Sequence, residues 1–429
     1  MSRKPSRALA EPGADESAIP PEEFRQRLSM WYREHARELP WRGTTDPYRI
    51  WVSEIMLQQT RVAAVIEHYN EFLRRFPTLV SLALAEEQDV LAAWSGLGYY
   101  RRARMLHKAA RFIVLEREGR FPAAAVELRT LPGIGDYTAA AIASIAFGEP
   151  VAVVDGNVER VILRLAGRAD EATAAVKTFI REQAQALMPK DAIPDGGKAE
   201  SRDPEKESRP RGLAWWDAAE RIALAASAKP TEPVGGAETR VRAVENAAGE
   251  HNQAMMELGA MVCVPKAPMC LQCPVHALCT TRGEHATPKK APQRSLPVAY
   301  LLDLRKRGTV TEVLLEKRPD DASLMPGMYE LPQLPIDVVD GREPVLRVRH
   351  SITNTNYYVQ VFAPKRNEPP SGGRGGRGEK SLRRAVPLKE RNTAWVRTNR
   401  LPSVPITGLT RKILQRLHVM ESSRISLLE

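Results

Sequence analysis

Two carboxyl side chains occupy positions from which they could act on a bond in a substrate. Glu54, in WVSEIMLQQT, interrupts an apolar helical pattern. If this carboxyl group is buried, loss of hydration raises its pKa and lets it donate a proton near neutral pH. Asp155, in VVDGNVERV, precedes a predicted helix, where it can cap the helix and stay ionised. An acid and a carboxylate in contrasting surroundings are the pair that glycosidic-bond chemistry uses. A solvent-facing glutamate and a simple N-cap are the alternatives.

All four cysteines of the chain lie close together, in a C-x6-C-x2-C-x5-C pattern. They are Cys263, Cys270, Cys273 and Cys279. A secreted disulfide framework would spread cysteines along a chain of this length, so the crowding predicts one metal site in a reducing compartment. Four thiolates can hold a structural zinc ion or a [4Fe–4S] cluster, and ligand chemistry alone does not separate the two.

A glycine-rich turn and a basic helix point to phosphate binding. In LPGIG, Gly133 and Gly135 permit close approach, and the N–H groups of the helix that follows can hold a phosphate. A tight connection between helices is the plainer interpretation. The segment YYRRARMLHKAAR places Arg101, Arg104, Lys108 and Arg111 at helical spacings beside two tyrosines that can stack on bases. A solvated charged helix face is the alternative.

Length and charge set the broad class. With 429 residues the chain is expected to form two or three domains, and 63 Lys+Arg against 52 Asp+Glu give a net charge of +11 that suits a phosphate-bearing partner. The sequence has no apolar run long enough to cross a membrane, and the basic N-terminus is not followed by an apolar segment. We therefore expect a soluble, cytoplasmic protein.

Composition divides the chain into segments. We predict a disordered N-terminus over 1–20, a helical domain over 21–281 with a low-complexity insertion at 190–245, a linker over 282–296 and an α+β domain over 297–420. Apolar residues from Trp51 to Leu73 predict one buried helical face that Pro77 closes. Further along, VAYLLDLRKRGTVTEVLLEKRP predicts a hairpin, NYYVQVF a strand, and PPSGGRGGRGEK a flexible connector. A short helix carrying Trp215 and Trp216 is expected inside the insertion.

Taken together, these motifs resemble the MutY-type adenine DNA glycosylases. The resemblance runs through LPWRG, DPYRIWVSEIMLQQTRV, WSGLGYYRRARMLHKAA, LPGIGDYTAAAI, VDGNVERV and HNQAMMELGAMVC, and more weakly through RHSITNT and LTRKIL. It implies a multidomain fold: an all-α helix-hairpin-helix glycosylase domain with a [4Fe–4S] cluster loop held by the four cysteines, and a C-terminal α+β Nudix-like domain.

The resemblance also implies an activity on double-stranded DNA. Adenine mispaired with 8-oxoguanine or guanine would be flipped out of the helix. Glu54 would protonate it at N7, and Asp155 would stabilise or transiently capture the sugar cation, with Tyr137 and Asn157 in support. Residues expected near the adenine or the duplex are Arg42, Gln58, Gln59, Thr60, Leu97, Tyr99 and Gln253. The protein is expected to act as a monomer.

Position 137 separates two reactions. Endonuclease III-like enzymes resemble this chain but carry a lysine there, which forms a Schiff base with the sugar and leads to strand cleavage. A tyrosine cannot form an imine, so Tyr137 predicts a monofunctional glycosylase. A bifunctional glycosylase/AP lyase and a non-catalytic iron–sulfur DNA-binding protein are the alternatives.

The C-terminal domain departs from the family pattern. Ile352, Thr353 and Asn354 stand where the family commonly has Phe-Ser-His against the damaged guanine. Thr353 keeps a hydroxyl group and is the candidate contact, but the aromatic ring and imidazole are missing. We therefore predict weaker discrimination between 8-oxoguanine and guanine. The glutamate-rich helix of Nudix hydrolases is not found, so no hydrolase activity of this domain is expected, and the segment between LPQLP and RVRH is too short for the family's helix.

Overall fold

The computed structural model describes residues 19–171, 173–190, 246–285, 293–339, 341–352, 355–364, 382 and 392–420. Several sequence predictions fall outside these residues: the insertion with Trp215 and Trp216, the Gly/Arg-rich segment, Thr353 and Asn354, and residues 1–18. Ile19, which lies within the segment predicted to be disordered, is buried.

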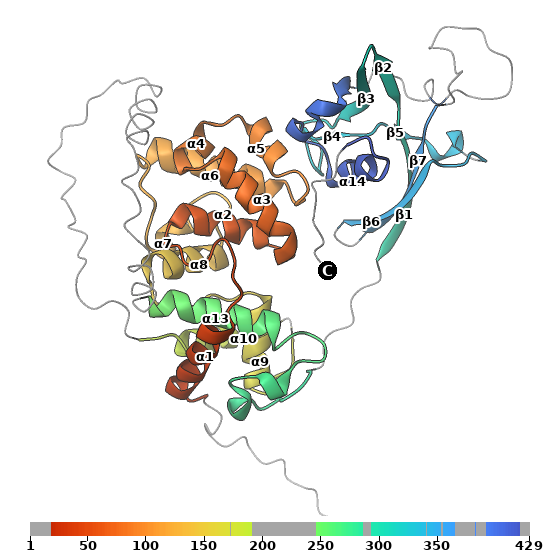
Figure 1. The fold of residues 1–429 in the computed structure, drawn as a ribbon. Helices are drawn as coiled ribbons and strands as arrows, with labels where there is room; N and C mark the ends of the chain where they lie inside the picture. The colour runs from red at the N-terminus through yellow and green to blue at the C-terminus, as the bar shows by residue number, and fades with distance from the viewer. Residues whose placement is uncertain are drawn as a thin grey trace, which may run out of the picture.

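The first part of the chain is helical and contains no strand among its described residues. Its helices are α1 (Pro21–His35), α2 (Pro47–Leu57), α3 (Val62–Arg75), α4 (Leu79–Leu84), α5 (Glu87–Ala93), α6 (Arg101–Glu116), α7 (Ala125–Leu128), α8 (Asp136–Phe147), α9 (Gly156–Leu165), α10 (Ala174–Ala186) and α13 (Ala247–Met261). Two 3₁₀ turns follow, η1 (Cys270–Gln272) and η2 (His276–Leu278). Helices α1 and α13 lie side by side although they are far apart in the sequence (Figure 1), and Ser29 on α1 donates to Glu250 on α13 at 2.6 Å.

The single helical face predicted from Trp51 to Leu73 is wrong in one respect. The chain leaves the helix after Leu57 and re-enters it at Val62, with Gln59 in the left-handed region at φ 54°. The last carbonyl groups of α2 accept hydrogen bonds from the Arg102 side chain. Side-chain donors can satisfy the carbonyl groups at a helix end that have no partner within the helix, which allows the chain to turn there. Two helices therefore replace one, and both still bury apolar residues.

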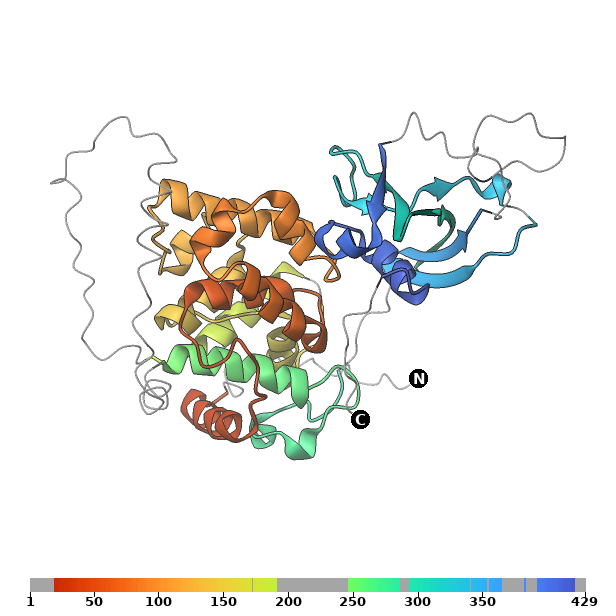
Figure 2. The same cartoon turned by 45° about the horizontal axis from the view of Figure 1, so that its top comes forward.

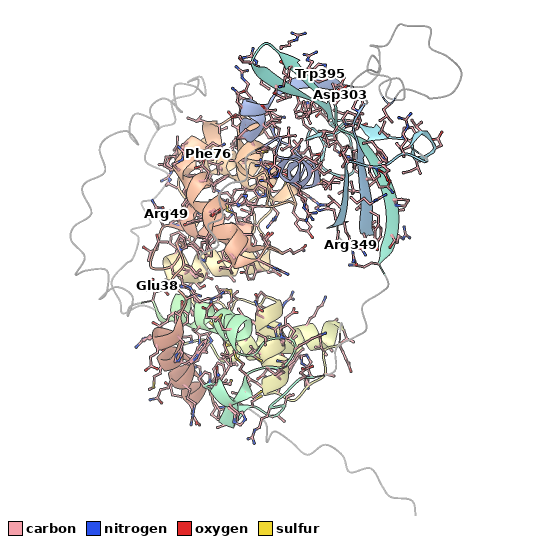
Figure 3. The ribbon with its side chains drawn as sticks, turned by 45° about the vertical axis from the view of Figure 1, so that its right-hand side comes forward. Glu38, Arg49, Phe76, Asp303, Arg349 and Trp395 are labelled. Atoms are coloured by element: carbon pink, nitrogen blue, oxygen red, sulfur yellow. The ribbon has the colours of Figure 1, made fainter. Side chains whose placement is uncertain are left out.

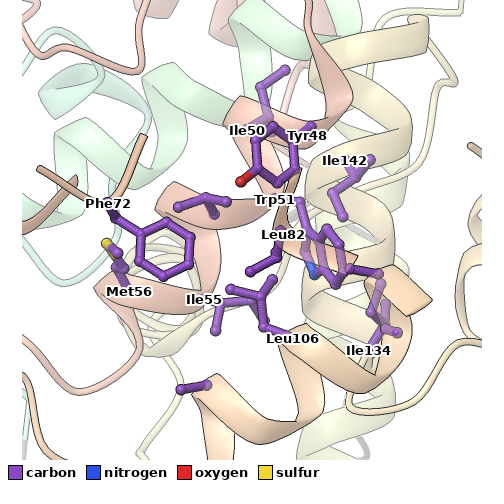
Figure 4. Close-up of a cluster of buried hydrophobic side chains, with 14 of the residues drawn as sticks. Tyr48, Ile50, Trp51, Ile55, Met56, Phe72, Leu82, Leu106, Ile134 and Ile142 are labelled. Carbon is purple, nitrogen blue, oxygen red and sulfur yellow. The ribbon is translucent and has the colours of Figure 1, made fainter. Parts of the chain in front are cut away.

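The helices enclose two hydrophobic cores. The first is formed by α2 to α8 and includes Trp51, Phe72 and Leu106, which Figure 4 shows among the buried side chains of this core. The second is formed by α1, α9, α10 and α13 with the segment that carries the cysteines, and includes Phe24, Ile162 and Leu258. Each large apolar side chain buried in this way contributes about 1.5–3 kcal/mol.

The C-terminal part is an α+β domain with two sheets. Its elements are β1 (Arg294–Leu301), β2 (Leu304–Arg307), β3 (Val310–Lys317), β4 (Tyr329–Glu330), β5 (Gln333–Leu334), η3 (Ile336–Val338), β6 (Leu346–Ile352), β7 (Thr355–Phe362), β8 (Thr393–Arg397), η4 (Thr398–Ser403) and α14 (Gly408–Arg416). One sheet has the order β5-β1-β7-β6; in the other β3 pairs with β2, β4 and β8. Figure 3 shows Arg349 on edge strand β6 and Trp395 on β8 toward opposite ends of this domain.

The strand predictions are partly confirmed. Strands β2 and β3 form the predicted antiparallel hairpin, with Gly308 at φ 63° in its turn, and NYYVQVF lies in β7. Strand β1 instead pairs with β7 in the other sheet and begins at Arg294, inside the expected linker. Between β5 and β6 the described residues form a single 3₁₀ turn, η3, in place of a longer helix.

The two domains meet through the loop after α5 (Figures 1 and 2). Ser95 and Tyr100 each donate a hydrogen bond to the Ile406 carbonyl oxygen at 2.9 Å, and Arg411 donates to Ser95 Oγ at 3.1 Å. Arg104 donates to the Pro326 carbonyl and pairs with Glu87. Two residues predicted to face a nucleic acid, Tyr100 and Arg104, thus serve the domain interface. Among the described residues, none of the helices combines the length and apolar character needed to cross a membrane.

Candidate active site

A cavity of about 200 Å³ lies at the junction of the two helical cores. Its volume is below the roughly 300–1,000 Å³ of pockets for drug-sized ligands, which suits a single base. The lining includes seven of the residues singled out from the sequence: Arg42, Glu54, Thr60, Tyr137, Asp155, Asn157 and Gln253. The candidate acid and the candidate carboxylate therefore face one space from two different cores.

Glu54 is an acid with a raised pKa. It lies on α2 among apolar side chains and is 4% exposed. Burial raises its pKa from 4.5 to about 7, the hydrogen bond from Tyr137 partly opposes this, and nearby Asp155 adds to the rise. The Tyr137 hydroxyl group donates to Glu54 Oε2 at 2.5 Å. Burial followed by the nearby Glu54 raises the pKa of Tyr137 well above 10, so this hydroxyl group keeps its proton. Glu54 is therefore able to hold and release a proton near neutral pH.

Asp155 is the N-cap of α9, as predicted. Its Oδ1 accepts hydrogen bonds from the backbone N–H groups of Asn157 at 2.9 Å and Val158 at 2.8 Å, and its Oδ2 accepts from the Asn157 side-chain amide at 2.9 Å. Arg160 in turn donates to Asn157 Oδ1 at 2.9 Å and to the Cys263 carbonyl at 2.7 Å. The orientation of the Asp155 carboxylate is thus fixed by a hydrogen-bond network that extends to the cysteine segment.

Glu257 is a site residue that the sequence analysis missed. Its side chain is 1% exposed and is bound by two arginines: Arg37 at 2.6 Å and Arg42 at 2.7 Å. Burial raises its pKa, but the hydrogen bonds and charges of Arg37 and Arg42 outweigh burial and lower the pKa to about 2. The signal was available, because Gln253 and Glu257 are four residues apart and share one face of α13. Arg42 is therefore held by a fixed anion at the wall of the cavity.

The glycine-rich turn has the conformation expected of a hairpin between helices. Gly133 has φ +77°, and a Cβ there would lie 2.4 Å from Met105 Cβ, so the close approach predicted for it is real. Gly135 is the N-cap of α8, no side chain caps that helix, and an added Cβ would meet no heavy atom within 4 Å. The free N–H groups of α8 and the open space at Gly135 form a surface that can receive an anion.

The residues expected to contact the duplex divide into two groups. Gln59 and Tyr99 are exposed and lie in the left-handed region, at φ 54° and 49°. Gln58 points inward and donates to Thr138 Oγ1 at 3.3 Å. Leu97 is 7% exposed and packs in the first core, so it cannot enter a duplex from this position. Gln58 is half-buried and Leu97 is buried in this structure, and contact of either side chain with the duplex stays a prediction.

The four cysteines lie in one short segment that packs on the second core. No group of three or more His, Cys, Asp or Glu side chains is arranged tightly enough to hold a metal ion in the part of the chain that the structure describes. The thiols are nevertheless electrostatic neighbours: burial and the three other cysteines raise the pKa of Cys273 to about 11. Arg164 donates to Cys263 Sγ at 3.4 Å. Four soft thiol donors beside a buried arginine fit a cluster of iron and sulfide better than a hard cation.

Comparisons with known proteins agree with this geometry. Residues 52–185 match the HhH-GPD superfamily of base excision DNA repair proteins. The chain is 38% identical over 268 residues to the adenine DNA glycosylase of Homo sapiens, covering 60% of this chain and 39% of that protein. It is 34% identical over 289 residues to the adenine DNA glycosylase of Mycobacterium tuberculosis, covering 67% and 77%.

The solved structures that are similar to this chain include a thermostable thymine-DNA glycosylase. It matches with a TM-score of 0.42 and 24% sequence identity, over 61% of this chain and 96% of that one. The match to the mammalian relatives spans only about 40% of their length.

Proposed function

The chain belongs to the adenine DNA glycosylase family, and from that premise we propose that it hydrolyses the N-glycosidic bond of adenine mispaired with 8-oxoguanine or guanine in duplex DNA. The observation that carries the proposal is the pairing of Glu54 and Asp155 across one cavity of about 200 Å³. One carboxyl group has its pKa raised to about 7, and the other caps a helix. A non-catalytic DNA-binding protein has no use for this arrangement.

Glu54 acts as the general acid. Oε2 of Glu54 accepts the hydrogen bond from the Tyr137 hydroxyl group. The other carboxyl oxygen of Glu54, Oε1, therefore carries the proton that is transferred to adenine N7. A protonated purine is a better leaving group because it departs as a neutral base. With a pKa of about 7, Glu54 is protonated in a large fraction of molecules at neutral pH.

Asp155 stabilises the sugar as the bond breaks. The departing base leaves positive charge on the deoxyribose, and a fixed carboxylate nearby lowers the energy of that state until water adds to the sugar carbon and loses a proton. Two backbone N–H groups and the Asn157 amide hold Asp155 before the substrate arrives. The carboxylate therefore needs no reorganisation during the reaction.

The reaction stops at base removal. Strand cleavage by the Schiff-base route needs an amine within reach of the sugar. No lysine lines the cavity among the described residues, and the side chain at 137 is a tyrosine hydrogen-bonded to Glu54. We therefore favour a monofunctional glycosylase over a bifunctional lyase.

Duplex DNA binds across the hairpin and the basic surface. The N-terminus of α8 beside Gly135 is placed to receive a backbone phosphate, and the net charge of +11 favours the polyanion. Exposed Gln59 follows α2, the helix that carries Glu54, and exposed Tyr99 lies in the loop before α6. In this proposal the protein acts as a monomer in the cytoplasm.

The four cysteines hold a [4Fe–4S] cluster, and the C-terminal Nudix-like domain faces the 8-oxoguanine. Cys263, Cys270, Cys273 and Cys279 supply one thiolate each. When bound, the cluster would cross-link the segment and supply a centre capable of one-electron transfer. The protein's own part is to fix this segment against α9 through Arg160 and Arg164.

One assay tests the proposal. The full chain is incubated with duplexes carrying adenine opposite 8-oxoguanine, adenine opposite guanine, or thymine glycol, and strand breaks are compared before and after alkali. We expect alkali-dependent breaks at adenine only, and their loss in Glu54→Gln and Asp155→Asn with duplex binding retained. Failure of a cluster-loaded preparation to release adenine from either mispair would refute the function. Breaks without alkali, together with a covalent protein–DNA complex formed when borohydride reduces the imine intermediate, would support the lyase.

A further inference from the structure

Arg102 joins three parts of the helical domain through one guanidinium group. Its Nη1 donates to the carbonyl oxygens of Ile55 at 2.7 Å, Met56 at 3.0 Å and Gln58 at 2.5 Å. Its Nη2 donates to the Gly98 carbonyl at 3.2 Å and, at longer range, to Leu97 and Thr60. Nη1 therefore binds the end of α2, and Nη2 binds both Thr60 and the loop before α6.

The segments that Arg102 binds are conformationally strained. Gln59, in the segment 58–60, has φ 54°, and Tyr99, in the segment 97–99, has φ 49°. Non-glycine residues adopt this conformation at a cost, and they keep it only where surrounding contacts enforce it. Arg102 supplies such contacts, and its guanidinium group also stacks on the rings of Trp94 at 5.5 Å and Tyr99 at 5.4 Å. Burial lowers the pKa of Arg102 to about 10, so the group keeps its charge at neutral pH.

The two segments lie between the C-terminal domain and the acid. Ser95 and Tyr100, which flank the segment 97–99, are the residues that bind the Ile406 carbonyl of the C-terminal domain. On the other side, Arg102 binds the carbonyl of Ile55, the residue after Glu54 on α2. The C-terminal domain is thus linked to the helix that carries Glu54 by two sets of hydrogen bonds, one at Ser95 and Tyr100 and one at Arg102, which the backbone of the loop joins.

We propose that Arg102 is a positioning residue that fixes the segments 58–60 and 97–99 to each other and to α2, so that adenine leaving the duplex arrives in register with Glu54. The inference rests on the proposed function. In the described structure, the guanidinium group faces carbonyl oxygens of the protein, so it acts through the segments that it binds. Lysine carries the same charge, but a single ammonium group cannot reach both the end of α2 and the loop.

The test uses the full chain with Arg102→Gln and Arg102→Lys, and with Arg120→Gln as the matched control. Arg120 is an exposed arginine that follows α6, and neither of the described segments 58–60 and 97–99 contacts it. Adenine release is measured under single-turnover conditions on the 8-oxoguanine mispair, and duplex affinity is measured in parallel. Extrusion of the base is followed separately by the fluorescence of 2-aminopurine at the target position. All measurements are made well below the melting temperature of every variant.

Both Arg102 variants are expected to release adenine about 10- to 100-fold more slowly, the size of loss that a misplacement of about 1 Å produces. Their duplex affinity should stay within about twofold of wild type, and the 2-aminopurine signal should rise more slowly. Arg120→Gln should release adenine at the wild-type rate. Hydrogen exchange without DNA should speed up in segments 58–60 and 97–99 of the Arg102 variants only.

Three results would overturn the inference. A wild-type rate in Arg102→Lys would mean that charge alone matters. Loss of affinity in proportion to rate would make Arg102 a DNA contact, and unchanged hydrogen exchange would show that it does not hold the segments. These results differ from failure of the proposed function, in which the wild-type chain itself releases no adenine; the hydrogen-exchange result would still test the role of Arg102.

Discussion

Replacing Glu54 with glutamine should make the protein more stable and inactive, and the gain in stability should depend on pH. Folding moves this carboxyl group into an apolar site and raises its pKa from 4.5 to about 7. At pH 4 and below the group is neutral in both the folded and the unfolded chain, so the wild-type protein and Glu54→Gln should differ little. Between pH 4.5 and 7 the unfolded chain releases the proton that the folded chain retains. The stability of wild type therefore falls with pH, whereas that of the variant does not respond at this position.

The magnitude follows from the size of the pKa change. One pKa unit is worth about 1.4 kcal/mol, so glutamine should stabilise the protein by about 1 kcal/mol at pH 5.5 and about 3 kcal/mol at pH 8.5. The hydrogen bond from Tyr137 is kept, because the glutamine carbonyl oxygen can accept it. Adenine release by wild type should decline as pH rises through about 7, since the acid form is lost.

The assay is urea denaturation of both proteins at pH 5.5 and 8.5, with Glu116→Gln as the control. Glu116 is an exposed glutamate at the end of α6, so the same substitution there should change the unfolding free energy little at either pH. A stability difference at position 54 that is equal at the two pH values would refute the reasoning, as would a variant less stable than wild type at pH 8.5. Either result would mean that Glu54 is ionised at low cost.

Four further outcomes are expected. Glu257→Gln should destabilise the protein by about 3–5 kcal/mol in urea denaturation, because it leaves Arg37 and Arg42 without their buried anion; a loss below 1 kcal/mol would contradict this. Gly133→Ala should lower the melting temperature, because Gly133 has φ +77° and an added Cβ would collide with Met105. Gly135→Ala should melt like wild type, because an added Cβ meets open space there, and should bind duplex more weakly. Equal melting temperatures of the two variants would contradict this prediction. Tyr137→Lys should form a covalent complex with DNA on borohydride treatment, and absence of that complex would mean that position 137 does not face the sugar. With Ile352, Thr353 and Asn354 in place of Phe-Ser-His, the ratio of adenine-release rates opposite 8-oxoguanine and guanine should be smaller than in a relative that carries Phe-Ser-His, and an equal or larger ratio would contradict the prediction.

Local features of the sequence were sufficient for much of the helical domain. The Asp155 cap, the Gly133 turn and the C-terminal hairpin are all predicted by the sequence and present in the structure. Each depends on residues close together in the chain: a side chain that reaches an N–H group two or three positions on, a backbone angle that only glycine adopts readily, or a turn between adjacent strands. Such features are read reliably because their partners are nearby in the sequence.

Contacts between distant residues could not be predicted in this way. The Arg102 side chain ends α2 more than forty positions earlier in the chain, which divided one predicted helix into two. Arg104 and Tyr100 were assigned to a nucleic-acid surface but bind the C-terminal domain, because the partner carbonyl groups lie hundreds of residues away.

The sequence by itself determined which chemical groups are available: two carboxyl groups in distinct motifs, a tyrosine in place of a lysine, and four thiols in one segment. Only the tertiary structure decided what those groups can do. The sequence pattern alone favours a solvent-facing helix residue at Glu54. The packing of α2 instead buries this side chain and places Tyr137, Asp155 and the cavity around it. The pKa of a carboxyl group depends on the water it loses and the charges it approaches, and both are set by side chains that the fold brings from elsewhere in the chain.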